Sequence, residues 1–170
     1  MTTDREDSNE AVFEQLFRDY QQPILNYVYR LVGDGARAED LTQEVFVKAY
    51  RGLSRLPVDA NHRAWLYRIA TNASYDYLRR RRLVKWLPLR ERDRVTDTFG
   101  GLEHVSTQQD EVQRTLAKLP PHDRAVLILY SVDGYSTAEI GEILGTTPGA
   151  VKTRLFRARE RFRRVHHEQS

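Results

Sequence analysis

Side chains suited to nucleic acid recur at steps of three and four residues in the first half of the chain. They are Arg68, Asn72, Tyr75, Arg79 and Arg82. On a helix this spacing places them on one face. Arginine contacts phosphates, asparagine can hydrogen-bond base edges, and an aromatic ring can stack on an unpaired base for about 1–3 kcal/mol. The pattern favours a nucleic-acid-binding face, and a solvated basic helix is the alternative.

A second candidate surface lies near the C-terminus, on a strongly basic segment. Its apolar stripe at helical spacing consists of Val151, Leu155, Ala158 and Phe162. The residues that fall on its other faces are Lys152, Thr153, Phe156 and Arg157. Because one face is apolar and the others are not, this segment predicts a helix that presents cations, a hydroxyl group and an aromatic ring to a partner.

Paired carboxylates offer a different chemistry. Asp40 and Glu44 are one helical turn apart, a spacing that can serve acid–base catalysis. No histidine or nucleophile converges on them, and Gln43 and Lys48 share their outer face. We expect either a contact surface for another protein or a solvated helix face, with catalysis as the third alternative.

The basic C-terminal segment follows a short helix with clear boundary signals. Ser136 and Glu139 form a capping box, and Gly145 suits the left-handed conformation that ends a helix. Thr147 can cap the next helix, and Gly141 lets the two helices approach closely. Two short helices joined by a glycine-containing turn, the second of them basic, predict a helix-turn-helix motif. An ordinary amphipathic hairpin is the alternative.

The N-terminal half is also predicted to be helical. Apolar residues recur with helical period over residues 12–20 and 24–31, and Pro23 interrupts them, so two helices are expected there. A third helix is expected over residues 36–51. Its inward residues are Ala38, Leu41, Val45, Phe46 and Ala49.

A loop at residues 54–62 leads to a helix over residues 63–82, which carries the arginine, asparagine and tyrosine face. The buried stripe expected on this helix is Leu66, Ile69, Ala70, Ala73 and Tyr77. In the C-terminal part, a core helix is expected over residues 125–132 after a break at a proline pair.

The helical periodicity fails between these two parts. Residues 84–106 are therefore predicted to be a flexible linker, in which Trp86, Leu87 and Leu89 are apolar enough to dock on a domain. Roughly twenty residues at ~3.3 Å each span up to ~65 Å. The predicted fold is all-α, with two small helical domains at residues 1–83 and 107–170.

Composition excludes several kinds of site. The sequence has no cysteine, which excludes disulfides, thiolate metal sites and cysteine nucleophiles. Its five histidines are scattered, apart from His166 and His167, and neither a metal nor another cofactor is predicted. The net charge is only +3, but positive charge gathers at residues 79–82 and 152–164. Without a signal peptide or an apolar run of spanning length, a cytoplasmic protein with no membrane insertion is expected.

Three segments together resemble bacterial RNA polymerase sigma factors of the extracytoplasmic-function (ECF) group of the sigma-70 family. They are DLTQEVFVKAYR at residues 40–51, AWLYRIATNASYDYLRRRR at 64–82, and residues 119–160, which begin LPPHDRAVLILY. The resemblance covers residues 12–162 in the family's order and spacing. It implies a polymerase subunit, not an enzyme, that directs promoter-specific initiation of transcription.

The resemblance also implies roles for the candidate surfaces. The coiled coil of the polymerase β′ subunit would be met by Asp40, Gln43 and Glu44. The minus-ten strand would be read at Asn72, and the rest of the predicted minus-ten site is Arg68, Tyr75, Arg79 and His62. The last of these belongs to the loop that would receive a flipped base. The minus-thirty-five element would meet Lys152, Thr153, Phe156 and Arg157. The polymerase β flap and an anti-sigma factor are further expected partners.

Two other functions are compatible with parts of the sequence. A self-sufficient repressor or activator would use the helix-turn-helix motif without polymerase. A nucleic-acid-processing enzyme would use the carboxylates of Asp40 and Glu44. The sigma-factor interpretation is favoured because a repressor has no need for both the Arg68–Arg82 face and the outer face at Asp40–Glu44.

Overall fold

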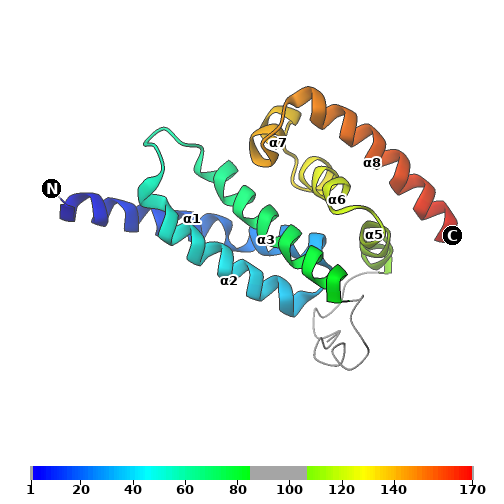
Figure 1. Ribbon diagram of the computed structural model, residues 1–170, viewed down its shortest axis with the longest axis horizontal. Coiled ribbons are helices and arrows are strands. Elements are labelled where there is room, and N and C mark those ends of the chain that lie inside the picture. Colours follow the sequence, from blue (N-terminus) through cyan, green and yellow to red (C-terminus); the bar gives the residue numbers. More distant parts are fainter. Residues whose placement is uncertain (1, 85–106, 170) are drawn as a thin grey trace.

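The computed structural model describes residues 2–84 and 107–169, and in these two ranges the chain forms helices and no strands (Figure 1). The N-terminal group consists of α1 (Thr2–Val32), α2 (Gly35–Gly52), the short 3-10 helix η1 (Leu53–Arg55) and α3 (His62–Val84). The C-terminal group consists of α5 (Thr107–Ala117), α6 (Pro121–Leu127), the π-helical segment η2 (Ile128–Val132), α7 (Thr137–Leu144) and α8 (Pro148–Gln169). The predicted all-α fold is confirmed.

Of the predicted linker at residues 84–106, the structure describes only Val84. This residue is the last residue of α3. Trp86, Leu87 and Leu89, the apolar residues expected to dock on a domain, lie outside the described residues.

The two helices predicted on either side of Pro23 are one helix, so that prediction was wrong. α1 runs without a break from Thr2 to Val32, and Pro23 lies on its exposed side. A proline inside a helix costs about 3 kcal/mol, because it removes a backbone hydrogen bond and crowds the preceding turn. Ile24, Tyr27 and Val28 beside it are fully buried, and burial stabilises by about 1.5–3 kcal/mol for each large apolar side chain. Tertiary packing therefore overrides the local break signal.

Helix α2 matches its prediction closely. Asp34 caps it, with the carboxylate Oδ1 accepting a hydrogen bond from the Arg37 backbone N–H at 3.1 Å. All of its predicted inward residues are buried: Ala38, Leu41, Val45, Phe46 and Ala49. Because this stripe is buried, the opposite face of α2, with Asp40, Gln43 and Glu44, is exposed.

Helix α3 is more deeply covered than its sequence stripe predicted. Asn61 caps it, with Oδ1 accepting from the Ala64 backbone N–H at 3.1 Å. Leu66, Ala70 and Ala73 are buried as predicted, while Ile69 and Tyr77 are only half-buried. The further residues buried on this helix are Ala64, Tyr67, Thr71 and Ser74. The reason is that α3 contacts the C-terminal helices as well as α1 and α2.

The two helical groups pack against each other and share one hydrophobic core. The ring of Tyr67 on α3 meets that of Tyr135, just before α7, at 5.3 Å between centroids. Gln113 Nε2 on α5 donates to the Arg30 carbonyl on α1 at 3.1 Å. In Figure 1 the orange α7 accordingly lies beside the green α3. Among the described residues no helix is long and apolar enough to cross a membrane.

The core helix predicted over residues 125–132 is divided in the structure. α6 ends at Leu127, and the chain continues as η2. Ile128 and Leu129 are buried, whereas Val132 is 50% exposed. The π-helical geometry thus turns the last residue of the predicted core helix toward the surface.

Candidate nucleic-acid interface

The helix-turn-helix motif is built from α7, the turn at residues 145–147 and α8. Ser136 caps α7, because its Oγ accepts from the Glu139 backbone N–H at 3.1 Å. Thr147 caps α8, because its Oγ1 accepts from the Ala150 backbone N–H at 3.1 Å. Side-chain caps of this kind satisfy amide groups that a helix start leaves unpaired. The predicted motif is confirmed.

Two glycines set the geometry of the turn. Gly145 has φ +68° and ψ +39°, the left-handed conformation that glycine adopts without strain. A Cβ atom on Gly141 would lie 2.7 Å from the carbonyl oxygen of Thr146. Only glycine therefore lets α7 approach the turn this closely, and that approach fixes the angle at which α8 leaves the motif.

The predicted recognition face of α8 is open to solvent. All four predicted side chains are exposed: Lys152, Thr153, Phe156 and Arg157. The opposite stripe holds the helix in place, with three residues buried and one half-buried: Val151, Leu155, Ala158 and Phe162. An aromatic ring that is 68% exposed, as Phe156 is, costs free energy in water and suits contact with a partner.

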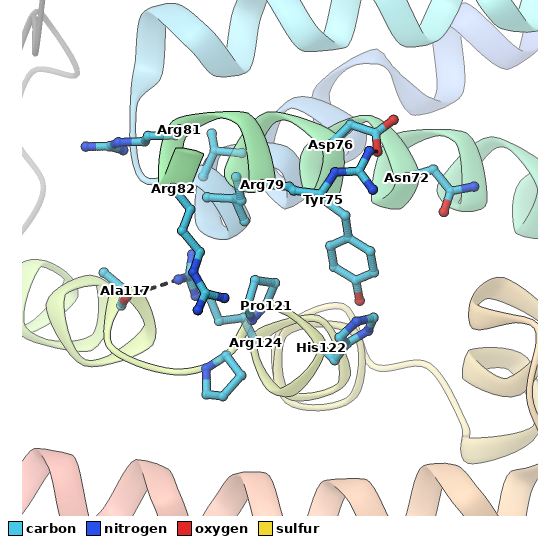
Figure 2. Close-up of a pocket in the computed structure, with 13 residues that line it drawn as sticks. Asn72, Tyr75, Asp76, Arg79, Arg81, Arg82, Ala117, Pro121, His122 and Arg124 are labelled. Carbon is cyan, nitrogen blue, oxygen red and sulfur yellow. Dashed lines mark hydrogen bonds and ion pairs between the residues drawn. The ribbon is translucent and has the colours of Figure 1, made fainter. Parts of the chain in front are cut away.

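The predicted minus-ten face of α3 is partly engaged by the C-terminal group. Asn72 and Arg79 are exposed, and Arg79 Nη2 pairs with Asp76 Oδ1 at 2.8 Å. Tyr75 is half-buried, and its ring extends from α3 toward His122 of α6, 4.5 Å between centroids (Figure 2). The guanidinium of Arg68 donates hydrogen bonds to backbone carbonyls at the end of α7.

A cleft of about 980 Å³ separates the rest of this face from α6 (Figure 2). The residues lining it from α3 and α6 are Asn72, Tyr75, Asp76, Leu78, Arg79, Arg81, Arg82, Pro121, His122 and Arg124. The guanidinium of Arg124 acts as a clamp, since it donates to the carbonyls of Leu119 at 2.9 Å, Ala117 at 3.0 Å and Leu31 at 2.6 Å. The clamp joins the end of α1 to the end of α5.

The aromatic contact in the cleft is uncharged. Burial raises the pKa of the Tyr75 phenol, so its hydroxyl stays protonated at neutral pH. Burial lowers the pKa of the His122 imidazole, and the nearby Arg154 lowers that pKa further, so the ring is neutral at pH 7. A neutral ring beside exposed arginines is the combination that binds an unpaired base and its phosphate.

The structure places His62 apart from the other predicted minus-ten residues. It is the first residue of α3 and is half-buried. Along the helix axis it lies ~15 Å from Asn72. The loop before it reaches outward, with Val58 at 96% exposure. The structure therefore brings Asn72, Tyr75 and Arg79 together at the cleft and leaves His62 at the loop end of the helix.

The predicted polymerase face of α2 is exposed at Asp40, Gln43 and Glu44. Glu44 Oε1 pairs with Lys48 Nζ at 2.9 Å, an i,i+4 contact on the helix surface. Within residues 2–84 and 107–169 there is no group of histidine and acidic side chains that could hold a metal ion. The carboxylates of this face thus lie on an open helix surface, as either a contact surface or a solvated face requires.

Two family models match the chain, Sigma-70 region 2 over residues 16–84 and Sigma-70 region 4 over residues 109–162. The chain is also 32% identical to the ECF RNA polymerase sigma factor SigW of Bacillus subtilis, over 92% of this chain and 89% of SigW. This chain belongs to the ECF group of sigma-70 sigma factors. It is 35% identical to the ECF sigma factor SigE of Mycolicibacterium smegmatis over 89% of its own length, and spans 60% of SigE.

This ECF sigma factor is similar to solved structures. It is similar to CnrH in complex with the cytosolic domain of CnrY, with a TM-score of 0.73 and 25% identity over 99% of this chain and 96% of that chain. It is also similar to the sigma factor RpoE in complex with the anti-sigma factor NepR from Bartonella quintana, with a TM-score of 0.71 and 25% identity over 90% and 95% of the two chains. Both comparisons span the two helical groups.

Several surface residues of the sigma factor were missed by the sequence interpretation. Val47 and Tyr50 on α2 are 47% and 59% exposed and continue the face of Gln43. Their helical spacing from Gln43 is a signal that could have identified them. By contrast, the contacts of Asn61 and Arg63 with α7 join residues more than 70 positions apart, and no local pattern predicts such pairs.

Proposed function

We propose that this sigma factor binds core RNA polymerase and directs it to promoters that carry a minus-ten and a minus-thirty-five element, in the cytoplasm and without catalysing a reaction itself. The observation that carries the proposal is that one ECF chain presents an exposed recognition face on α8 and an arginine-, asparagine- and tyrosine-bearing face on α3. The first suits duplex DNA and the second suits melted strand. The proposed domains are residues 1–83 and 107–170, joined by residues 84–106.

The α8 face supplies distinct contacts for the minus-thirty-five duplex. Arg157 can donate two hydrogen bonds to a guanine edge, whereas Lys152 is a point charge suited to a phosphate. Phe156 can contact a thymine methyl group, and Thr153 can hydrogen-bond either a base edge or the backbone. This set of side chains supports direct readout in the major groove.

The α3 face supplies contacts for the melted minus-ten strand. Asn72 can hydrogen-bond a base edge, Tyr75 can stack on a base, and Arg68 and Arg79 can neutralise phosphates. His62, at the start of the helix, is proposed to belong to the loop that receives a flipped base. Flipping costs a few kcal/mol, which these stacking and edge contacts offset.

Polymerase docking is assigned to surfaces on both helical groups. The α2 face at Asp40, Gln43 and Glu44 is proposed to meet the coiled coil of β′. An apolar groove of about 240 Å³ between α5, η2 and α8 is proposed to receive the β flap, and its apolar lining includes Val112, Leu116, Ile128, Val132 and Phe162. Because its structural neighbours CnrH and RpoE were solved with CnrY and NepR, an anti-sigma factor is a further proposed partner.

Co-purification with core polymerase tests this proposal. Glu44→Lys should weaken binding to the core by roughly tenfold or more, because a reversed charge at an interface adds repulsion to the lost attraction. Glu14→Lys, an equal charge change at an exposed site on α1, is the control. Unchanged core affinity of Glu44→Lys, with normal helical circular dichroism, would contradict the assigned surface. Failure of the wild-type protein to bind the core would contradict the proposed function itself.

A further inference from the structure

The acidic side of α7 lies against the N-terminal end of α3. Glu139 Oε2 pairs with Arg63 Nη2 at 3.0 Å. Glu142 Oε2 accepts a hydrogen bond from Asn61 Nδ2 at 2.8 Å. Both carboxylates thus occupy donors at the end of α3 where the proposed single-strand face begins. Carboxylate oxygens and phosphate oxygens satisfy the same donors.

Arg68 continues this contact toward the middle of α3. Its Nε donates to the Ile143 carbonyl at 3.3 Å, and its Nη2 donates to the Glu142 carbonyl. These carbonyls belong to the last turn of α7, where a helix leaves acceptors without an internal partner and carries partial negative charge. The guanidinium proposed to neutralise a DNA phosphate therefore caps the helix-turn-helix motif instead.

We propose that the acidic edge of α7, defined as Glu139, Glu142 and the carbonyls of residues 142 and 143, is a self-binding surface that competes with single-stranded DNA for α3. The inference rests on the proposed function, since it assigns a competitor to the proposed minus-ten face. The acidic edge supplies negative charge and hydrogen-bond acceptors, the two features that a DNA backbone would bring to Arg63 and Arg68.

The competition is confined to one of the two DNA-binding surfaces. The recognition face of α8 is exposed and takes no part in the contact. Farther along α3, Asn72, Arg79 and Arg82 line the open cleft, so a strand can engage them first and then displace the acidic edge. The protein in this state can therefore bind minus-thirty-five duplex while the acidic edge still covers part of the minus-ten face.

The contacts are of a strength that polymerase or DNA can overcome. The side chains of Arg63 and Glu139 are 38% and 40% exposed, which places their ion pair near the surface. Pairs of this kind are individually weak. When a closed form is favoured several-fold over the open form, the apparent affinity for a competing ligand falls by that same factor. The acidic edge thus adds a reversible contribution to the shared core and the Arg124 contacts that also hold the two groups together.

The test uses the full chain with Glu139→Gln and Glu142→Gln combined. Glutamine keeps the capping box at residue 139, because that motif accepts either residue. The matched control combines Glu10→Gln and Glu14→Gln, an identical charge change on exposed residues of α1. A fluorescent single-stranded oligonucleotide should bind the α7 variant roughly three- to tenfold more tightly than the control. Equal affinities, or no single-strand binding by either variant, overturn the inference.

Interdomain distance gives an independent measurement. Because the chain has no cysteine, Ser8→Cys on α1 and Arg164→Cys on α8, both exposed, introduce the only two labelling sites. The α7 variant should show a longer-distance population than the control before DNA is added. An unchanged distance distribution overturns the inference. Promoter opening by wild type with core polymerase separates the two failures: if opening occurs, only the self-binding surface is wrong, and if opening fails, the proposed minus-ten role is wrong.

Discussion

The two surfaces proposed to bind DNA differ in how far the rest of the protein covers them. On α8 the side chains of Lys152, Phe156 and Arg157 are exposed. On α3, Arg68 caps α7 and Tyr75 packs against His122. The first surface needs no rearrangement to enter a major groove, whereas the second must be uncovered before it can hold a melted strand along its whole length.

This difference follows from what each surface must bind. Duplex DNA is always available, and an exposed helix suffices to sample it. A melted strand exists only after the duplex has been opened, at a cost of a few kcal/mol. A basic, aromatic face that is covered in the free protein has less opportunity to bind unrelated single-stranded nucleic acid. With the roles proposed for the two faces, the packed helical groups would separate promoter search from strand capture.

Gly141→Ala should have the largest effect on this comparison, because α7 belongs to both surfaces. Its new Cβ would lie 2.7 Å from the Thr146 carbonyl oxygen, so the turn must shift, at roughly 1–3 kcal/mol of stability. Duplex binding should fall together with the melting temperature. Gly149→Ala is the control, since its Cβ meets no atom within 4 Å and alanine favours a helix. Equal melting temperatures for the two variants would contradict the proposed role of the close approach.

Arg157→Ala and Lys152→Ala test the separate roles proposed for two residues of the α8 surface. Arg157→Ala should relax base preference at one or two positions by about 1–3 kcal/mol. Lys152→Ala should weaken all sequences about equally and reduce the salt slope by about one unit. The measurement is binding of the full chain to single-base variants of a minus-thirty-five duplex at several salt concentrations. If Lys152 instead carries the preference, the two roles are reversed.

Asn72→Ala tests the role proposed for the α3 surface in promoter opening. Loss of one amide contact should weaken promoter opening by about 1 kcal/mol, roughly fivefold, and leave minus-thirty-five duplex binding unchanged. Permanganate footprinting of melted thymines in the holoenzyme measures opening, and mobility shift measures duplex binding. A loss of duplex binding with normal opening would reverse the assignment of the two faces.

The smallest expected effect concerns pH and Asp133, between η2 and α7. Burial raises the pKa of this carboxyl to about 6, and Arg30 on α1 partly opposes the shift. A carboxyl with a raised pKa favours the folded state while protonated, so its contribution is present below about pH 4 and is lost as pH rises through about 6. Asp133→Asn should therefore stabilise the protein at pH 7.5 more than at pH 4.5 in thermal unfolding. Equal effects at both values would exclude this titration.

Local signals predicted the elements well where the structure depends on neighbours in sequence. The cap at Ser136, the left-handed Gly145 and the alternation of buried and exposed residues on α8 are all local, and all are confirmed. Pro23 was misinterpreted because burial of Ile24 and Tyr27, a tertiary effect, outweighs its local cost. The sequence pattern shows the tendency of proline to break a helix, but it does not show the tertiary packing that opposes this tendency.

The state of the candidate site could not be predicted for the same reason. The spacing of Asn72, Tyr75 and Arg79 placed them on one face, and the structure has them lining one cleft. That Tyr75 meets His122, or that Arg124 joins α1 to α5, depends on how the two helical groups pack. Such packing is set by the shared core, to which residues far apart in sequence contribute.

In vitro transcription tests the central claim most directly. Core polymerase, genomic DNA fragments and this protein should together yield transcripts from a small set of start sites that share a minus-ten and a minus-thirty-five element. Core polymerase alone should not produce them. Arg157→Ala should change which minus-thirty-five sequences are used, and Asn72→Ala should reduce transcription from all of them. Promoter-specific transcripts that fail to appear with wild-type protein, although it binds core polymerase and duplex DNA, would contradict the account.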